Sequence, residues 1–350
     1  MIQESTELVA SVVVATHERA ALLPRLVKAM ADQTERRIEL IVVDDGSRDD
    51  TWETLTGLAA STAFPLIPLQ LASNQGPALA RNVGWRRARA PYIAFTDDDC
   101  VPLPNWLTVL VDFLHVADIV QGRTRPDPAQ ANGRGPFSRV VHVEEQDGYF
   151  ETCNIAYRRS WLERLGGFDE SHRFRRRPHR GGRPIYGEDT DLGWRAREHG
   201  AVAVFAPTAL VYHDVSRSSY IAELRNARRA GGIPKLVRRH PGMRDLMFWR
   251  VFYLPHHAFA LAAAAGIVIA SIRTAPRGVR VGALLLCLPY ADARTGLLAD
   301  VPLARRSTHR MPLWTRRRKQ LALLPLALAA DLFEVAVLAG SSIPERTLLL

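Results

Sequence analysis

Residues 92–100 read YIAFTDDDC, an apolar run of strand length that ends in three consecutive carboxylates. Neighbouring carboxylates repel one another, and burying them is costly unless a cation or several hydrogen-bond donors compensate their charge. A divalent metal is the simplest compensation. Side chains of an extended segment alternate between two faces, so Asp97 and Asp99 can converge on one ion while Asp98 points elsewhere. A solvated turn without a metal is the alternative reading, because Asp clusters are common in loops.

Working outward from this run, apolar segments of strand length alternate with amphipathic helical patterns. The predicted strands are residues 8–15, 38–43, 65–71 and 92–95. The predicted helices are residues 22–30, a segment that begins at residue 50 or 51, and a segment that carries Arg81, Asn82 and Trp85. This alternation predicts an α/β fold, a mostly parallel sheet with helices on both faces. Polar residues follow each strand, where open sheets of this kind bind their ligands.

Two common nucleotide-binding motifs are missing from the sequence. No Gly-x-Gly-x-x-Gly follows the first strand and no GxxxxGK[ST] occurs, which argues against a dinucleotide-dependent dehydrogenase and a phosphate-loop ATPase. The polar groups that remain are Asp45 after the second strand, residues 97–99 after the fourth, and Arg81 between them. This set suits a nucleotide whose base or ribose is held by one carboxylate and whose diphosphate is held through a metal.

Five motifs, in a single order, resemble those of the family 2 glycosyltransferases. They are VVVATHER at 12–19, IVVDDGS at 41–47, NQG at 74–76 with Arg81 and Asn82, FTDDD at 95–99, and GEDTDL at 187–192. The resemblance covers roughly residues 8–215 and is poor beyond about residue 235. It implies a GT-A fold, a nucleotide-diphosphate sugar donor, a divalent cation (Mg²⁺ or Mn²⁺) and inversion at the anomeric carbon.

Carried over motif by motif, the resemblance assigns donor-binding roles to five residues: Thr16, Glu18, Asp45, Arg81 and Asp98. Asp45 matches the carboxylate that accepts from the base, and Asp98 matches a ribose or sugar contact. The resemblance assigns the metal to Asp97 and Asp99. His213 follows the predicted strand that ends at residues 211–212 and is either a further metal ligand or a structural histidine.

The motif at residues 187–192 opens a predicted helix that runs to His199. A carboxylate at a helix N-terminus is kept ionised by the dipole and the free amides, and a proton acceptor needs the ionised form. The resemblance makes Asp189 the base that takes the proton of the acceptor hydroxyl, with Glu188 or Asp191 orienting the base or the acceptor. N-capping without chemistry is the alternative.

Three cysteines, Cys100, Cys153 and Cys287, are widely spaced and form no CxxC pair, which is typical of reduced thiols in the cytoplasm. We expect Cys153 to be structural, because no histidine lies near it in sequence and an inverting transfer needs no nucleophile. Residues 171–184, SHRFRRRPHRGGRP, are predicted to form a mobile loop. Its arginines are either solvated or contact the donor diphosphate or a phosphate of a lipid-linked acceptor.

The net charge of +10 is concentrated in the C-terminal part of the chain. Residues 1–235 hold 30 Lys/Arg and 30 Asp/Glu, whereas residues 236–350 hold 16 and 6. We therefore predict a catalytic domain at residues 1–235 that does not bind nucleic acid. Residues 236–350 are predicted to form a basic region that meets an anionic surface such as phospholipid headgroups.

Apolar segments in this region suggest contact with a membrane. Residues 252–272 are 21 residues without Asp, Glu, Lys or Arg, the length of one bilayer crossing. Residues 281–291 are also apolar but too short to cross a bilayer. Residues 321–343 are interrupted by Asp331 and Glu334, which favours a helix face turned to protein or an interfacial helix. The N-terminus shows no signal peptide. The predicted location is the cytoplasmic face of the cell membrane, with a soluble helical extension as the alternative.

The predicted reaction is transfer of a sugar to a hydroxyl of a glycan or a lipid-linked acceptor. One alternative is transfer to a polyprenyl phosphate, which would use the same donor site. Another is a catalytically silent scaffold of the same fold at the membrane. The sequence argues against this alternative, because it keeps Asp45, Asp97, Asp99 and Asp189.

Overall fold

The computed structural model describes residues 7–133, 141–170, 187–216, 219–295 and 317–350. They form two compact units, the first from residues 7–128, 141–170 and 188–214, and the second mainly from residues 219–295 and 317–350. The arginine-rich stretch 171–184 lies outside the described residues.

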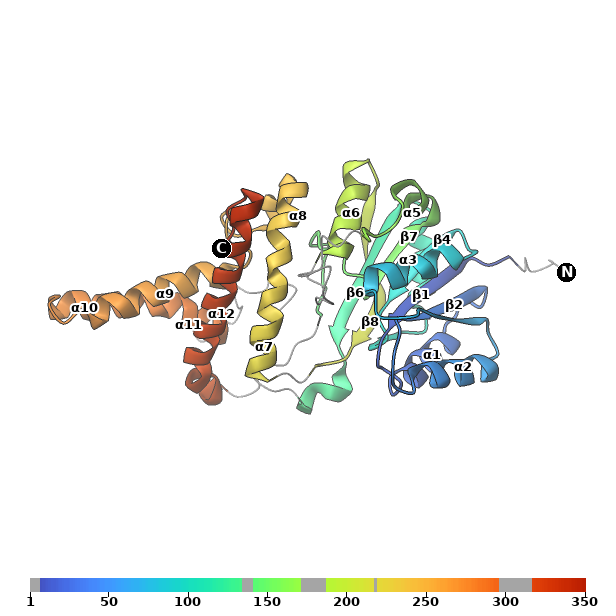
Figure 1. The fold of residues 1–350 in the computed structure, drawn as a ribbon, viewed down its shortest axis with the longest axis horizontal. Helices are drawn as coiled ribbons and strands as arrows, with labels where there is room; N and C mark the ends of the chain where they lie inside the picture. Colours follow the sequence, from blue (N-terminus) through green and yellow to red (C-terminus); the bar gives the residue numbers. More distant parts are fainter. Residues whose placement is uncertain (1–6, 134–140, 171–186, 217–218, 296–316) are drawn as a thin grey trace. The chain divides into compact units, whose positions relative to one another are not determined.

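The first unit is built on one eight-stranded sheet with the order β3-β2-β1-β4-β7-β6-β8-β5 (Figure 1). Its strands are β1 Ala10–Thr16, β2 Ile38–Asp44, β3 Leu66–Gln70, β4 Tyr92–Thr96, β5 Cys100–Pro102, β6 Ile119–Pro126, β7 Asn154–Arg158 and β8 Ala203–His213. Strands β3, β2, β1 and β4 are parallel, and β8 is parallel to β6. Strand β7 is antiparallel to β4 and β6, and β5 is antiparallel to β8. The predicted α/β fold with a mostly parallel sheet is confirmed.

Helices pack on both faces of this sheet. They are α1 Leu23–Ala31, α2 Thr51–Ser61, α3 Pro77–Arg87, α4 Trp106–Leu114, α5 Arg159–Leu165 and α6 Glu188–Glu198. Val12 and Val14 of β1 join a core with side chains of α1, α2 and α4. Val13 points to the opposite face, where α3 lies so close that a Cβ added to Gly84 would be 2.4 Å from its Cγ1. Glycine at this position therefore sets how closely α3 packs on the sheet.

Parallel pairing brings the ends of the first strands to one edge of the sheet. Thr16 pairs with Asp44, and Asp44 pairs with Gln70, so β1, β2 and β3 end side by side. The loop after β3 leads into α3 through Gly76, whose φ of +95° lies in a region that favours glycine. Pro77 then occupies the first turn of α3, where no N–H donor is needed. These turns place polar loops at the carboxyl edge.

The second unit is helical. Its helices are α7 Tyr220–Ala227, α8 Ile233–Arg239, α9 Pro255–Ser271, α10 Arg277–Leu284, α11 Leu288–Thr295 and α12 Arg317–Glu345. Ala260 and Ala263 of α9 pack with Tyr290 of α11 and with leucines of α12. Asp331 of α12 is 2% exposed and accepts hydrogen bonds from the Tyr290 hydroxyl at 2.7 Å and from Arg294 Nε at 2.9 Å.

The apolar segments differ in part from the prediction. The helix within residues 252–272 is α9, which has 17 residues because it begins at Pro255 and ends at Ser271. The described helix that is long and apolar enough to cross a membrane is α12, where Ala322–Glu345 has a mean hydropathy of 2.0. A helix packed inside a protein meets the same criterion. Asp331 and Glu334 of α12 are both buried, in agreement with a helix face turned to protein.

Candidate active site

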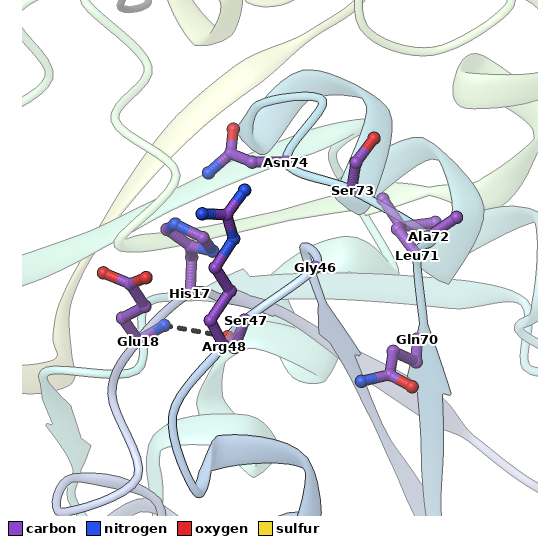
Figure 2. A pocket seen from close by; sticks show the side chains of 10 residues that line it. All are labelled: His17, Glu18, Gly46, Ser47, Arg48, Gln70, Leu71, Ala72, Ser73 and Asn74. Carbon is purple, nitrogen blue, oxygen red and sulfur yellow. Dashed lines mark hydrogen bonds between the residues drawn. The ribbon is translucent and has the colours of Figure 1, made fainter.

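A cavity of about 390 Å³ lies between the loops that follow β1, β2 and β3. Its lining residues are His17, Glu18, Gly46, Ser47, Arg48, Gln70, Leu71, Ala72, Ser73 and Asn74. Figure 2 shows the side chains of His17, Arg48 and Asn74 around one space, each from a different loop. The cavity is therefore at the carboxyl edge of parallel strands, where α/β sheets bind ligands.

Asp45 fixes one wall of this cavity. Its Oδ1 accepts the N–H of Gln75 and its Oδ2 accepts the N–H of Gly76, both at 2.7 Å. Hydrogen bonds from amides to a carboxylate are strong, so they tie the loop after β3 to the loop after β2. Asp45 is 4% exposed and is not among the lining residues. Its contact with the base of a donor stays a prediction.

The loop after β1 connects the cavity to the acidic run. Glu18 lines the cavity with a φ of +54°, an uncommon conformation for a residue other than glycine, and its N–H donates to Ser47 Oγ at 2.8 Å. Thr16, two residues earlier, is 2% exposed and donates its hydroxyl to Asp98 Oδ2 at 2.7 Å. Thr16 thus contacts the acidic run, whereas Glu18 lines the cavity.

Asp97, Asp98 and Asp99 form a turn between β4 and β5, which the Cys100 N–H closes by donating to the Asp97 carbonyl at 3.2 Å. The expected extended geometry is therefore wrong, because the chain turns before β5 instead of continuing β4. The three carboxylates have different partners. Asp97 accepts from Arg81 at 3.0 Å, Asp98 accepts from the Thr16 hydroxyl, and Asp99 lies 3.5 Å from His213 Nε2. Burial and the charge of Asp99 raise the pKa of Asp98 to about 7.

The pair formed by Asp99 and His213 suits a divalent cation. His213 ends β8 and pairs with Cys100, and its Nδ1 lies 2.8 Å from the Asp214 carbonyl oxygen. A carbonyl only accepts, so Nδ1 carries the proton, and in a neutral ring the Nε2 lone pair faces the Asp99 carboxylate. Cys100 lies within 4.8 Å of both groups, but burial raises its thiol pKa well above the ordinary value. Asp99 and His213 are therefore the residues that fit a metal.

Arg25 of α1 stabilises the region around Asp99 and His213, and this role was not predicted from the sequence. Its guanidinium lies 2.5 Å from Asp214 Oδ1 and 3.3 Å from Asp127 Oδ2, which joins the ends of β6 and β8. The Asp214 N–H donates to the Asp99 carbonyl at 2.9 Å. The contact between residues 25 and 214 has no local sequence signal, because only the fold brings them together.

Arg81 connects the acidic turn with the start of α6. Its side chain is 8% exposed, with one terminal nitrogen 3.0 Å from Asp97 Oδ1 and the other 3.4 Å from Glu188 Oε1. Phe168, a second residue missed in the sequence, lies 5.8 Å from the guanidinium carbon. Arg81 therefore bridges the two acidic motifs that the sequence separates by almost a hundred residues.

Asp189 is partly buried, and its Oδ1 accepts the Thr190 N–H at 2.8 Å. Burial and the neighbouring charge of Glu188 raise its pKa to about 7, although Arg81 opposes this change. Burial of Asp189 thus opposes the effect of the helix N-terminus, which was expected to keep this carboxylate ionised. A pKa close to neutrality is the value that an effective general base has.

Asp191 does not join the acidic groups near Arg81. It is fully buried and accepts from Arg195 Nε at 2.8 Å. Arg195 also donates to the carbonyls of Leu165 and Gly167, at 2.9 and 2.6 Å, and so secures the end of α5. Of the two residues predicted to assist Asp189, the structure places Glu188 beside it. Cys153 is 2% exposed, and burial raises its pKa well above the ordinary value, which agrees with a structural thiol.

This architecture is shared with nucleotide-sugar transferases of the GT-A type. A mannosyltransferase of Pyrobaculum calidifontis, solved in complex with GDP-Man and Mn²⁺, is similar with a TM-score of 0.56 and 16% identity over 96% of this chain and 87% of that chain. That mannosyltransferase therefore binds a nucleotide sugar and Mn²⁺, and its likeness to this chain is one of fold.

Sequence comparisons give the family. Residues 11–177 match the Glycosyl transferase family 2. A pre-mycofactocin glycosyltransferase of Mycobacterium tuberculosis is 30% identical over 249 residues, 66% of this chain and 48% of the relative. A validoxylamine A glucosyltransferase of Streptomyces hygroscopicus is 25% identical over 69% of this chain and 63% of the relative. Residues 11–177 of the chain thus belong to glycosyl transferase family 2, and the chain spans about half the length of the first of these relatives.

Proposed function

We propose that the protein transfers a sugar from a nucleotide-diphosphate donor to a hydroxyl of a glycan or lipid-linked acceptor, with inversion at the anomeric carbon. The observation that carries this proposal is the position of Arg81, which contacts Asp97 of the acidic turn and Glu188 of α6. One buried side chain thus joins the motif expected to face the donor diphosphate to the motif expected to supply the base.

In this proposal Asp189 removes the proton from the acceptor hydroxyl as that oxygen attacks the sugar. Glu188 raises the affinity of Asp189 for the proton, and Arg81 limits this effect. Inversion by a single displacement requires the base and the leaving diphosphate on opposite sides of the sugar. Asp99 and His213 would hold a Mg²⁺ or Mn²⁺ ion, which when bound offsets the negative charge that grows on the leaving group.

The donor would enter the cavity between the loops after β1, β2 and β3. Glu18 and Arg48 line this cavity and offer polar contacts to a nucleoside, while Asp45 holds the wall to which Asn74 belongs. Thr16 and Asp98 connect this cavity to the acidic turn. The basic C-terminal region and the apolar helix α12 support association with the cytoplasmic face of a membrane, where a lipid-linked acceptor would be found.

A thermal-shift panel tests the donor site. The full chain is heated with UDP-, GDP- and dTDP-sugars in Mn²⁺ or in EDTA. A donor at a hundred times its Kd stabilises the folded state by about 2.7 kcal/mol, which raises the melting temperature by several degrees. We expect one donor to produce a metal-dependent shift, and an exposed control, Asp112→Asn, to retain it. If no nucleotide sugar shifts the melting temperature with either Mn²⁺ or Mg²⁺, the proposed activity is wrong, and a scaffold of the same fold remains.

A further inference from the structure

The second unit contains a helical hairpin, which we define as residues 255–295. Its first arm is α9, and its second arm continues from α10 through a 3-10 turn at Leu285–Cys287 into α11 (Figure 1). Both α10 and α11 pack against α9. The arms lie so close that a Cβ added to Gly266 would be 2.3 Å from the Ala283 carbonyl oxygen. The inner faces of the two arms therefore pack against each other.

The outer face of the second arm carries an apolar stripe. Val281, Leu284, Leu285 and Leu288 follow the spacing i, i+3, i+4, i+7 and share one side of the helix. They are 59%, 49%, 62% and 51% exposed. Amphipathic helices of globular proteins turn such a stripe toward the core, whereas here the buried positions of the arm are Ala283, Tyr290, Asp292 and Ala293. Ile267 and Val268 of α9, 47% and 61% exposed, add to the apolar surface of the hairpin.

Arginines accompany this stripe. Arg273 and Arg277 are exposed at the bend between the arms, and Arg280 is one turn further along α10. The hairpin contains one acidic residue, Asp292, which is buried, and a fourth arginine, Arg294, which pairs with Asp331. A second copy that docked through the same surface would bring like charges together with no exposed carboxylate of the hairpin to compensate them. Lipid phosphates provide the complementary charge, and acyl chains the complementary apolar surface.

We propose that this hairpin is the segment that enters the headgroup region of an anionic phospholipid bilayer. The stripe lies among the outer acyl segments and the arginines contact the phosphates. This inference rests on the proposed membrane association and assigns it to the hairpin instead of α12. Helix α12 turns Asp331 toward Tyr290 and Arg294 of α11, and a buried charge of this kind marks a helix face that is covered by protein and not by lipid.

Vesicle flotation of the full chain tests the assignment. Vesicles are neutral (phosphatidylcholine) or anionic (phosphatidylcholine and phosphatidylglycerol, seven to three). The stripe variant combines Val281→Ser, Leu284→Ser, Leu285→Ser and Leu288→Ser. We expect it to lower the partition coefficient on anionic vesicles at least about a hundredfold, because each side chain loses its apolar burial.

A second variant combines Arg273→Gln, Arg277→Gln and Arg280→Gln. We expect each arginine to contribute roughly fivefold, so the variant should lower the partition coefficient on anionic vesicles about a hundredfold. The partition coefficient on neutral vesicles should stay unchanged. The control combines Val116→Ser and Val202→Ser, which are exposed apolar residues of the first unit, and retains full binding.

Four outcomes separate the possibilities. Equal flotation of the stripe variant and the unmodified chain overturns the assignment, because another segment then binds the lipid. An unmodified chain that does not float but is dimeric by light scattering, with a monomeric stripe variant, also overturns it, because a second copy then covers the stripe. Flotation that is lost in the stripe variant, while its far-UV circular dichroism and its donor-induced thermal shift are retained, confirms it. Flotation without any donor shift leaves the hairpin assignment standing and refutes the proposed activity.

Discussion

Replacing Asp189 by asparagine tests both the proposed base and the burial of its carboxyl group. The amide keeps nearly the same shape, and its oxygen can still accept the Thr190 N–H, which lies 2.8 Å from Oδ1. It cannot take a proton from an acceptor hydroxyl. We therefore expect transfer to fall by roughly 10²- to 10⁴-fold, the usual contribution of a general base, while the donor-induced thermal shift is retained.

The same substitution changes how stability depends on pH. The pKa of Asp189 rises from 3.8 to about 7 on folding, so between these values the folded protein holds a proton that the unfolded chain has released. Stability is therefore lost as the pH rises through this window and is lowest above pH 7. At 1.36 kcal/mol per pKa unit the whole effect is at most ~4 kcal/mol, and partial exposure and coupling to Glu188 reduce it to about 1–2 kcal/mol.

Urea unfolding at pH 5 and pH 8, in EDTA and without nucleotide, measures this effect. Asp189→Asn is expected to gain stability relative to the unmodified chain on going from pH 5 to pH 8. Asp191→Asn serves as the control: it breaks the buried pair with Arg195, so it is expected to lose stability at both pH values. An Asp189→Asn variant with unchanged transfer would refute the proposed base. If the stability of Asp189→Asn depends on pH in the same way as that of the unmodified chain, the raised pKa of the Asp189 carboxyl group is refuted.

The remaining predictions concern the metal, the cavity wall and the sheet. His213→Ala is expected to abolish the Mn²⁺-dependent part of the donor thermal shift, whereas the exposed His199→Ala retains it; an unchanged metal dependence would exclude His213 as a ligand. Asp45→Asn leaves one of two buried amides without its acceptor, so we expect a loss of ~1–3 kcal/mol in urea unfolding and weaker donor binding by titration calorimetry; equal donor affinity would refute the wall's role. Gly84→Ala forces α3 away from β1 and is expected to cost ~1–3 kcal/mol, whereas Gly57→Ala, with open space around it, stabilises by ~0.5–1 kcal/mol; similar effects would contradict the packing argument.

Much of the fold could be predicted from the sequence, because the first strands are continuous apolar runs and the helices between them have one apolar face. The prediction of β1, β2 and β4 depends on local patterns alone. The antiparallel insertion of β7 between β4 and β6 could not be predicted in this way, since it depends on pairing between Thr96 and Asn154. The length of α9 was overestimated, because hydropathy does not show that the helix begins only at Pro255.

The identities of the acidic residues at the site could be predicted, but their partners could not. Asp97 and Asp99 were expected to act together on one side of an extended segment. The turn directs Asp97 toward Arg81 and Asp99 toward His213 instead. Asp45 was expected to face a ligand, and its two oxygens hold main-chain amides. In each case the residue type indicated a need for donors or a cation, whereas tertiary structure decided which group supplies them.

The three carboxylates of residues 97–99 show what this difference means for the chemistry. A run of like charges needs compensation, and the sequence alone suggested that one metal provides it. The structure distributes the compensation over three elements: Arg81 of α3 contacts Asp97, Thr16 of β1 donates to Asp98, and His213 of β8 faces Asp99. The first two partners carry a proton to share. The third pair, a carboxylate facing an imidazole, contains two acceptors when the ring is neutral, and it is the pair that we propose would hold a cation. The proposed cation site is thereby narrowed from the run of three carboxylates to Asp99 and His213.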